Sequence, residues 1–571
     1  MDRILHCILM VSWRSVIISI LSISALFFSA TMLSQQFISL AALASTIRTD
    51  VFPEASVPII SGTTTVPQYF QTSPELWAGP TATGKAPFLA QTNPVFFEPT
   101  ASFTPNSPLE TSIPIVGAQP DQNVFQLMGH LSPYFPNPDG FGVNEYPLPP
   151  GARISQVQML SRHGARYPTS ENSVATFGKK ISELKGKFTA KGQLAFLNNW
   201  KYELGQGVLV PRGRQELFNS GVLHYYQYGQ LYNPNSKIIV RTTTQDRMLK
   251  SAENFLAGFF GLEWTQNATI EVIIEAQGYN NSLAGYDNCY NSHGFRSAGG
   301  NNASHEWKEI YLQDATKRFN LMLEGMEWNT MDTYAAQTLC PYETVAYGYS
   351  SFCQLFTLEE WKGFEYSIDL FFAGSSSFQS PTARAVGIGY VQESIARLQN
   401  HTLGYSGSQI NLTLDNNTET FPLNQSLYFD FSHDTNIMSI LTAFGFKQFN
   451  ALLPVDHHPG PHNLTVSRLT PFGARLDIEI IKTPYPLNSQ RIYEKLPKET
   501  TYLHFMLNQR TLPLGLSFPE CDPDRLDGWC ELDTFLSAQK NATQLARYDY
   551  ACNGNYDAVP WGGIVDGSPV G

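Results

Sequence analysis

The sequence has little charge, and most of the charge it has is negative. Only 15% of the 571 residues are charged, and the formal net charge is -12. This balance argues against nucleic acid as a partner, because binding to a phosphate backbone needs an excess of lysine and arginine. It does not exclude an anionic substrate, since a local group of cations can lie within an acidic protein. Hydrophobic residues make up 42% of the chain, as in an ordinary globular protein.

No charged residue lies between positions 15 and 46, and the first half of this segment is almost wholly apolar. Its length is near what a helix needs to cross a bilayer. Arg3 and Arg14 precede it, which favours a cytosolic N-terminus and export of the rest of the chain. We therefore expect residues 1–48 to be a cytosolic tail with a type II membrane anchor, or a long signal peptide cut after a site such as Ala44.

Basic residues are also nearly absent from the next part of the chain. Residues 51–150 hold 18 of the 36 prolines and a single lysine or arginine, Lys85. Together with frequent serine and threonine, this composition predicts an extended, disordered and O-glycosylated stalk. We assign the stalk to residues 49–119 and one folded domain to residues 120–571, because aromatic and apolar residues return near Val124.

Cysteines are few, and none lies in a close Cys-x-x-Cys metal motif. Cys7 precedes the apolar segment, and the other six suit three disulfides in an oxidising compartment. Six cysteines allow fifteen pairings, among which spacing does not choose. They are Cys289, Cys340, Cys353, Cys521, Cys530 and Cys552. Nine Asn-x-Ser/Thr sequons indicate N-glycans on an exported domain. Their asparagines are Asn267, Asn280, Asn302, Asn400, Asn411, Asn416, Asn424, Asn463 and Asn541.

Three segments of the folded part share one pattern, in which a short apolar run with strand character ends at polar residues. They are residues 154–160 with Arg162 and His163, residues 237–240 with Arg241, and residues 426–431 with His433 and Asp434. Helical patterns follow the second and third runs and end at Gly261 and Gly445. The alternation of strands and helices predicts an α/β sheet, in which the ligand binds beyond the carboxyl ends of the strands.

The residues at these strand ends are suited to phosphoryl transfer. Arg162, Arg166 and Arg241 present planar donors that match the oxygens of a tetrahedral dianion, so the site needs no metal or other cofactor. Fixed cations stabilise the transition state more than they stabilise free substrate. His163 can attack phosphorus through a ring nitrogen and form a phosphohistidine. Asp434 can protonate the leaving alkoxide, which implies activity in acidic medium.

The string RHGxRxP at Arg162–Pro168, together with the later His-Asp pair, resembles the histidine acid phosphatases, and within them the branch of fungal acid phosphatases and phytases. The resemblance runs from about Gln126 to about Cys552. Its strongest matches are SRHGARYPT (161–169), LAFLNNW (194–200), VRTTTQDR (240–247), DFSHDTNI (430–437), TPFGARLDIEII (470–481) and LHFMLNQRTLPL (503–514).

This resemblance implies a role for each residue at the strand ends. His163 is expected to be the nucleophile and Asp434 the proton donor. The expected phosphoryl-binding residues are Arg162, Arg166, Arg241 and His433. The implied fold is a phosphoglycerate-mutase-like α/β sheet domain with a smaller helical domain over the active site. The implied disulfides are Cys289–Cys552, Cys340–Cys353 and Cys521–Cys530. The chain lacks a cysteine that the family usually has before the first strand, and also its partner.

Two other functions compete with a histidine phosphatase. Asp456, His457 and His458, with His462 nearby, look like ligands of a metal-dependent phosphoesterase. The prolines around them and the lack of further strand-end aspartates favour a surface loop instead. A non-catalytic cell-surface glycoprotein is the second alternative, against which the intact pair of His163 and Asp434 argues.

The sequence leaves the substrate open between phytate and small organic phosphates. Phytate carries many negative charges, so a phytase needs additional lysine or arginine around its pocket. Lys179, Lys180 and Lys185 follow the first motif and are candidates for this role, or they form an ordinary solvated helix face.

Overall fold

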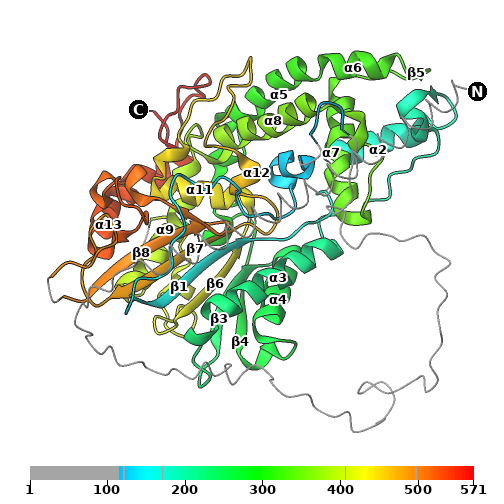
Figure 1. Cartoon of the computed structure of the whole chain (residues 1–571). Coiled ribbons are helices and arrows are strands. Elements are labelled where there is room, and N and C mark those ends of the chain that lie inside the picture. The colour runs from blue at the N-terminus through cyan, green and yellow to red at the C-terminus, as the bar shows by residue number, and fades with distance from the viewer. Residues whose placement is uncertain (1–114, 120–121, 170–171, 406, 496–497, 571) are drawn as a thin grey trace, which may run out of the picture. The chain divides into compact units, whose positions relative to one another are not determined.

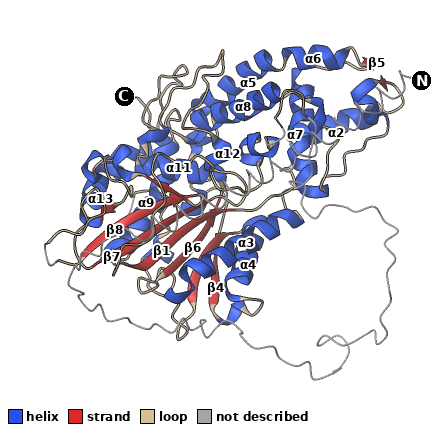
Figure 2. Ribbon diagram, viewed as in Figure 1, coloured by secondary structure: helices blue, strands red, loops and turns tan. Residues whose placement is uncertain are grey.

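The computed structural model describes residues 115–119, 122–169, 172–405, 407–495 and 498–570. Its centre is a mixed sheet with the strand order β10-β8-β7-β1-β6-β3-β4 (Figures 1 and 2), which confirms the predicted α/β class. Its strands are β1 (Arg153–Arg162), β3 (Ile238–Thr243), β4 (Ala268–Ile273), β6 (Leu427–Ser432), β7 (Arg475–Thr483), β8 (Thr500–Leu507), β9 (Arg510–Leu512), which pairs with β8, and β10 (Cys530–Glu531).

The three predicted strands lie side by side in the parallel half of the sheet. β1 pairs with β6, β6 with β3, and β3 with β4, all in parallel, whereas β7, β8 and β10 extend the sheet in antiparallel pairs. The register places Arg162 opposite Ser432, so the polar residues that follow β1 and β6 are neighbours.

Side chains alternate between the two faces of the sheet, and helices cover both. On one face, Phe429 and Phe431 of β6 pack against Phe255 of α4 (Asp246–Phe260), with ring centroids 4.9 and 5.5 Å apart. α3 (Pro211–Tyr228) packs beside α4. On the other face, α9 (Ala383–Gln399) and α11 (Asp434–Phe444) pack together. α4 and α11 end at Gly261 and Gly445, both with positive φ, as predicted.

A second group of helices forms the helical part that the family resemblance implies. It consists of α2 (Ser173–Glu183), α5 (Gly299–Tyr311), α6 (Gln313–Asn320), α7 (Thr330–Tyr347) and α8 (Leu358–Ser376). α2 is inserted between β1 and β3, and the other four between β4 and β6. Figure 1 shows these helices grouped apart from α3 and α4. The remaining short elements are β2 (Thr189–Ala190), β5 (Leu323–Glu324), α10 (Leu412–Asp415), α12 (Val466–Leu469), α13 (Leu532–Ala538), α14 (Ala542–Ala546) and α15 (Tyr548–Asn553).

The folded domain includes residues before its predicted start at 120. Ile115 is buried in the core, and the backbone nitrogen of Leu358 donates to the carbonyl of Val116 at 2.8 Å. The predicted tail, the anchor and the stalk up to residue 114 lie outside the described residues. Within the described part, no helix is long and apolar enough to cross a membrane.

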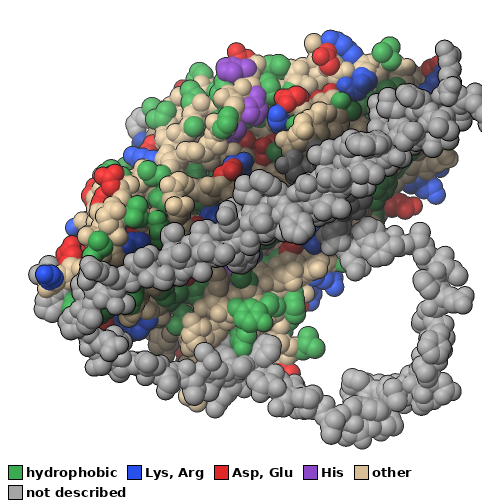
Figure 3. Space-filling view, viewed as in Figure 1, with side chains coloured by type: hydrophobic (Ala, Val, Ile, Leu, Met, Phe, Trp, Pro, Cys, Tyr) green, Lys and Arg blue, Asp and Glu red, His purple; other side chains and the backbone are tan. Residues whose placement is uncertain are grey.

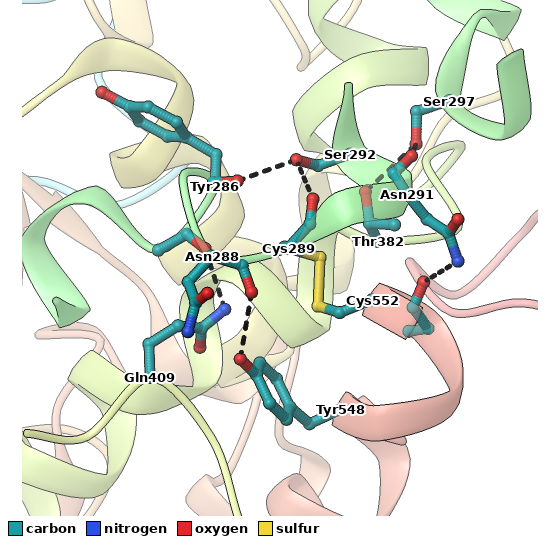
Figure 4. The surroundings of a disulfide bond; sticks show 12 residues. Tyr286, Asn288, Cys289, Asn291, Ser292, Ser297, Thr382, Gln409, Tyr548 and Cys552 are labelled. Atoms are coloured by element: carbon teal, nitrogen blue, oxygen red, sulfur yellow. Dashed lines mark hydrogen bonds between the residues drawn. A yellow bond between two sulfur atoms is a disulfide. The ribbon is translucent and has the colours of Figure 1, made fainter. Parts of the chain in front are cut away.

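Three disulfides join the six cysteines, and the pairs Cys289–Cys552, Cys340–Cys353 and Cys521–Cys530 confirm the pairing that the resemblance implies. The first bond closes a separation of 263 residues (Figure 4), so it restricts the unfolded chain more than the two short loops do.

The surface agrees with the low and mixed charge of the sequence. On the face shown in Figure 3, acidic and basic side chains are interspersed among apolar and neutral ones. The asparagines of all nine sequons are exposed or half-buried, so each can be reached from solvent.

Candidate active site

The ends of β1 and β6 bring the two predicted catalytic motifs into contact. The backbone nitrogen of His163 donates to the carbonyl of Ser432 at 3.3 Å, which continues the pairing of the two strands by one residue. The rings of His163 and His433 lie edge to face with their centroids 5.6 Å apart. Asp434 follows directly as the first residue of α11. Residues about 270 positions apart in the sequence therefore share one buried site.

The ring of His163 is held in one tautomer. Its Nδ1 lies 2.9 Å from the carbonyl oxygen of Gly164. Because a carbonyl can only accept, Nδ1 must donate its hydrogen, and Nε2 is left with a free lone pair. Burial, and then the charges of Arg162, Arg247 and Arg166, lower the pKa of His163 well below its ordinary value. The neutral imidazole is thus the stable form in the free enzyme.

Arg162 and Asp434 form the closest ion pair of the site. Nη2 of Arg162 lies 2.6 Å from Oδ2 of Asp434, and the arginine side chain is fully buried. Nη1 donates to the carbonyls of Thr470, at 2.9 Å, and of His130. These contacts fix the guanidinium at the end of β1.

Asp434 is ionised in the free enzyme. Burial would raise the pKa of its carboxyl group, but Arg162, followed by His130 and Arg166, outweighs that effect and holds the pKa well below the usual range. Oδ1 also accepts a hydrogen bond from the backbone nitrogen of Thr435 at 2.8 Å. The side chain is still 13% exposed, so a ligand can reach it.

His433 is positioned by a carboxylate that the sequence analysis did not identify. Its Nε2 lies 2.9 Å from Oε2 of Glu275, and the hydroxyl of Tyr286 donates to Oε1 of the same carboxylate at 2.9 Å. Burial raises the pKa of Glu275, but His433 outweighs this effect and the net shift is downward. Glu275 follows β4, the neighbour of β3, so it too is a polar residue beyond the end of a strand.

Two further arginines face the same site. Arg166 is buried, and its Nη1 donates to the carbonyl of Tyr167 at 3.0 Å. Arg247, in the first turn of α4, was not among the predicted residues. Burial, and then the charge of Arg166, lowers the pKa of Arg247. Three arginines therefore surround His163, while Asp434 is the carboxylate that pairs with one of them.

Most of the folded chain is similar to one known protein family. Residues 153–508 match the model of the histidine phosphatase superfamily (branch 2). The chain belongs to this family. Phytase A of Aspergillus fumigatus is 33% identical over 450 residues, which cover 74% of this chain and 89% of that protein. Phytase A of Arthroderma benhamiae is 31% identical over 449 residues, covering 76% and 91%.

The fold is also similar to that of a solved phytase structure. The crystal structure of the phytase from D. castellii superposes with a TM-score of 0.60 at 24% identity, covering 77% of this chain and 89% of that one. This histidine phosphatase is a phosphomonoesterase that acts through the histidine phosphatase mechanism.

Arg241 does not join the other predicted residues of the phosphatase site. β3 continues past Arg241 to Thr243, so Arg241 lies opposite Asp430, two residues before the end of β6. Its Nε donates to Asp430 and its Nη2 to Glu393, each at 2.7 Å, and the side chain is 2% exposed. Buried carboxylates thus accept hydrogen bonds from its Nε and Nη2. Arg247, six residues later, is the arginine of this segment whose charge lowers the pKa of His163.

The candidate metal ligands remain apart from the strand ends. His457 pairs with Asp456 at 2.7 Å on the surface, His458 lies against Tyr366, and Nε2 of His462 contacts Asp369 at 2.9 Å. Among the described residues, no group of three or more histidine, cysteine, aspartate or glutamate side chains could hold a metal ion. The contacts of this segment are those of a loop packed on α8.

Proposed function

We propose that the enzyme hydrolyses phosphate monoesters by transferring the phosphoryl group to Nε2 of His163. The observation that carries this proposal is the orientation of the His163 ring, with Nδ1 bound to Gly164 and Nε2 free among three arginines. The lowered pKa of His163 favours the unprotonated nitrogen, which is the form that can attack phosphorus.

Arg162, Arg166 and Arg247 bind the phosphoryl oxygens, and His433 completes this set. Their positive charge neutralises the dianion and the additional charge that develops on the equatorial oxygens in the transition state. Glu275 holds the His433 ring in place through the contact of 2.9 Å. Glu275 is therefore a positioning residue, because it acts through His433.

Asp434 transfers the protons in both half-reactions. In the first, Nε2 forms a bond to phosphorus while the ester oxygen leaves and takes the proton of Asp434. In the second, the Asp434 carboxylate removes a proton from water, whose oxygen attacks phosphorus as the P–N bond breaks. A bound phosphoryl dianion competes with Asp434 for Arg162 and adds negative charge beside the Asp434 carboxylate. Both effects raise the pKa of Asp434, so that it can carry a proton in acidic medium.

A trapping experiment tests the nucleophile. The full-length enzyme is mixed with radiolabelled p-nitrophenyl phosphate at acidic pH and quenched in alkali, in which phosphohistidine survives. The label should be found on the wild-type protein and be absent from His163→Ala, which should also be inactive. Turnover by His163→Ala would overturn the proposal. Activity should persist in EDTA, and its loss would instead support a metal-dependent phosphoesterase.

Leaving groups test the role of Asp434. In Asp434→Asn, hydrolysis of an alkyl phosphate should slow far more than hydrolysis of p-nitrophenyl phosphate, because nitrophenolate leaves without a proton. Equal slowing of both substrates would contradict the assignment of Asp434 as the general acid.

We also infer that the enzyme acts outside the cytosol, as an anchored or secreted glycoprotein. The disulfides and the accessible sequons support this location, since disulfides persist in oxidising compartments and N-glycans are attached in the secretory pathway. Sequencing the N-terminus of enzyme purified from a eukaryotic host distinguishes a cleaved signal from a retained anchor. A mature chain without N-glycans would contradict the inference.

The lysines considered for phytate recognition have other surroundings. Lys180 donates to Asp332 at 2.6 Å and to the carbonyl of Glu327 at 2.7 Å. Lys179 and Lys185 line a surface pocket of about 450 Å³ that also includes Trp200. No catalytic residue lines this pocket.

A further inference from the structure

The strand β4 forms one edge of the central sheet, beside β3 (Figure 1). We propose that an N-glycan on Asn267, the residue directly before β4, covers this free edge and prevents it from pairing with β4 of a second copy of the enzyme. This inference rests on the location outside the cytosol that we proposed above. It adds a specific role for one of the nine sequons.

The outer side of β4 has unpaired backbone groups. The carbonyl of Asn267 accepts a hydrogen bond from the backbone nitrogen of Ile238, on the side of β3, at 3.0 Å. Because the hydrogen bonds of a strand alternate between its two sides, the N–H and C=O groups of Ala268, Ile270 and Val272 point away from β3. Among the described residues these groups have no hydrogen-bond partner, so they can pair with another strand.

The side chains of this edge favour such pairing. Residues 268–274 include neither proline nor glycine, and five of the seven are β-branched. Val272 and Ile274 are 42% and 45% exposed. The segment has one charged residue, Glu271, and burial raises the pKa of its carboxyl group to about 7, so the group is neutral in acidic medium. An exposed apolar edge strand without charge or proline pairs readily with other chains.

The opposite edge of the sheet is formed differently. There β8 is bordered by β9 and β10, which contain only three and two residues. Short edge strands limit pairing between molecules. β4, with six residues, lacks this protection.

Asn267 is placed to provide another kind of protection. It begins the sequon at 267–269, and the hydroxyl of Tyr232 donates to its Oδ1 at 3.2 Å. Its Nδ2, the atom that carries an N-glycan, has no partner among the described residues and is not buried. In two other sequons, Nδ2 of Asn280 and of Asn463 donates to a backbone carbonyl at 3.0 Å. A glycan is bulky and solubilising, so at this position it hinders the approach of a second strand.

A second copy of the chain is the partner that the glycan excludes. A twofold axis beside β4 would bring the same strand of two molecules together in antiparallel orientation, and each would satisfy the free backbone groups of the other. The enzyme should therefore form an additional dimer when the glycan is missing.

The test uses the full-length enzyme from a eukaryotic host. Glycopeptide mass spectrometry should find Asn267 occupied. Asn267→Gln and Thr269→Ala remove the sequon, whereas Thr269→Ser keeps it and Asn302→Gln removes the sequon of α5. In sedimentation at acidic pH, the first two variants should reach about twice the mass of the wild type as concentration rises. The other two should keep the mass of the wild type.

A second substitution locates the contact. Val272→Lys, added to Asn267→Gln, should restore the mass of the wild type, because a charge on an edge strand opposes pairing. In the dimer, hydrogen exchange at the amides of Ile270 and Val272 should slow. A dimer with unchanged exchange there, or slowed exchange without a dimer, would overturn the inference.

Two outcomes separate this inference from the proposed location. A bare Asn267 beside an occupied Asn302, or an Asn267→Gln variant with the mass of the wild type, would overturn this inference alone. The absence of glycans from every sequon would overturn the proposed location as well.

Discussion

Two groups of arginines lie along the same parallel strands, and they differ in how their charge is balanced. Around Arg241, the guanidinium groups of Arg241 and Arg397 contact Asp430 and Glu393 within 2.7 Å. Burial and the charge of Glu393 raise the pKa of the neighbouring Asp415 to about 9, so that this third carboxyl is neutral. Two cations therefore pair directly with two anions of the protein itself.

At the strand ends the balance is different. Arg162 pairs with Asp434, while Arg166 and Arg247 have no carboxylate partner among the described residues at the 4 Å limit of an ion pair. The positive charge that remains is available to a bound anion. An arginine in the middle of a strand supports the fold, and an arginine beyond its end is available for substrate.

The largest effect is expected from breaking the balanced group. Arg241→Met leaves Asp430 and Glu393 buried without their main partner, which costs about 3–5 kcal/mol of stability. The midpoint of denaturant unfolding should fall accordingly. Arg247→Met is the matched control and should shift the midpoint little. Similar losses in both variants would remove the distinction between the two groups.

Catalytic activity, unlike stability, should fall strongly when Arg247 is replaced. Arg247→Met removes a cation that stabilises the transition state, and kcat/KM for p-nitrophenyl phosphate should fall by about 10²–10³-fold. Lys250→Met, on the same helix, loses only a partly exposed ion pair with Glu253 and should keep normal kinetics. If Lys250→Met were as impaired as Arg247→Met, a general disturbance of α4 would be the cause.

Inorganic phosphate should stabilise the protein through the group at the strand ends. At one hundred times its Kd, a ligand that binds the folded state alone contributes about 2.7 kcal/mol. Phosphate should therefore raise the thermal midpoint of the wild type and have a much smaller effect on Arg166→Met. A rise of equal size in that variant would mean that phosphate binds at another site.

A third buried site carries an excess of carboxyl groups and should make stability depend on pH. Burial and Asp369 raise the pKa of Glu365 from its ordinary 4.5 to about 8. Between these values the folded state keeps a proton that the unfolded state has lost, so stability falls as the pH rises, by up to about 1.4 kcal/mol per pH unit. Below pH 4.5 both states are protonated and the effect ends.

Glu365→Gln reproduces the neutral form and should flatten this dependence, most clearly near neutral pH. Glu359→Gln, at an exposed glutamate of the same helix, should retain the slope of the wild type. The measurement is the midpoint of unfolding from pH 4 to 8. An unchanged slope in Glu365→Gln would assign the dependence to other groups.

The sequence predicted those parts of the fold and site that depend on local pattern. The apolar alternation of β6 and the short run of β1 identified His163, His433 and Asp434, because strand ends are marked by a change from apolar to polar residues. The same rule misplaced Arg241, since β3 continues through two threonines that can lie inside or outside a sheet.

Arg247 and Glu275 could not be predicted from local pattern. Arg247 reaches the site only because α4 starts there and packs on the sheet. Glu275 does so because β4 lies next to β3, a neighbour relationship that hydrophobic periodicity does not determine. The carboxylate that follows the run at 268–273 was the available signal, and the same strand-end rule that found His433 could have been applied to it.

The disulfide between Cys289 and Cys552 links enzyme maturation to the support of the active site. Cys289 lies three residues after Tyr286, whose hydroxyl donates to the Glu275 carboxylate beside His433, and Cys552 lies in α15, the last helix of the described residues. This segment acquires its covalent attachment only after the ribosome has synthesised α15 and an oxidant has joined the two thiols. A chain cut short before α15 would retain every catalytic residue and lose the covalent support of the segment that carries Tyr286.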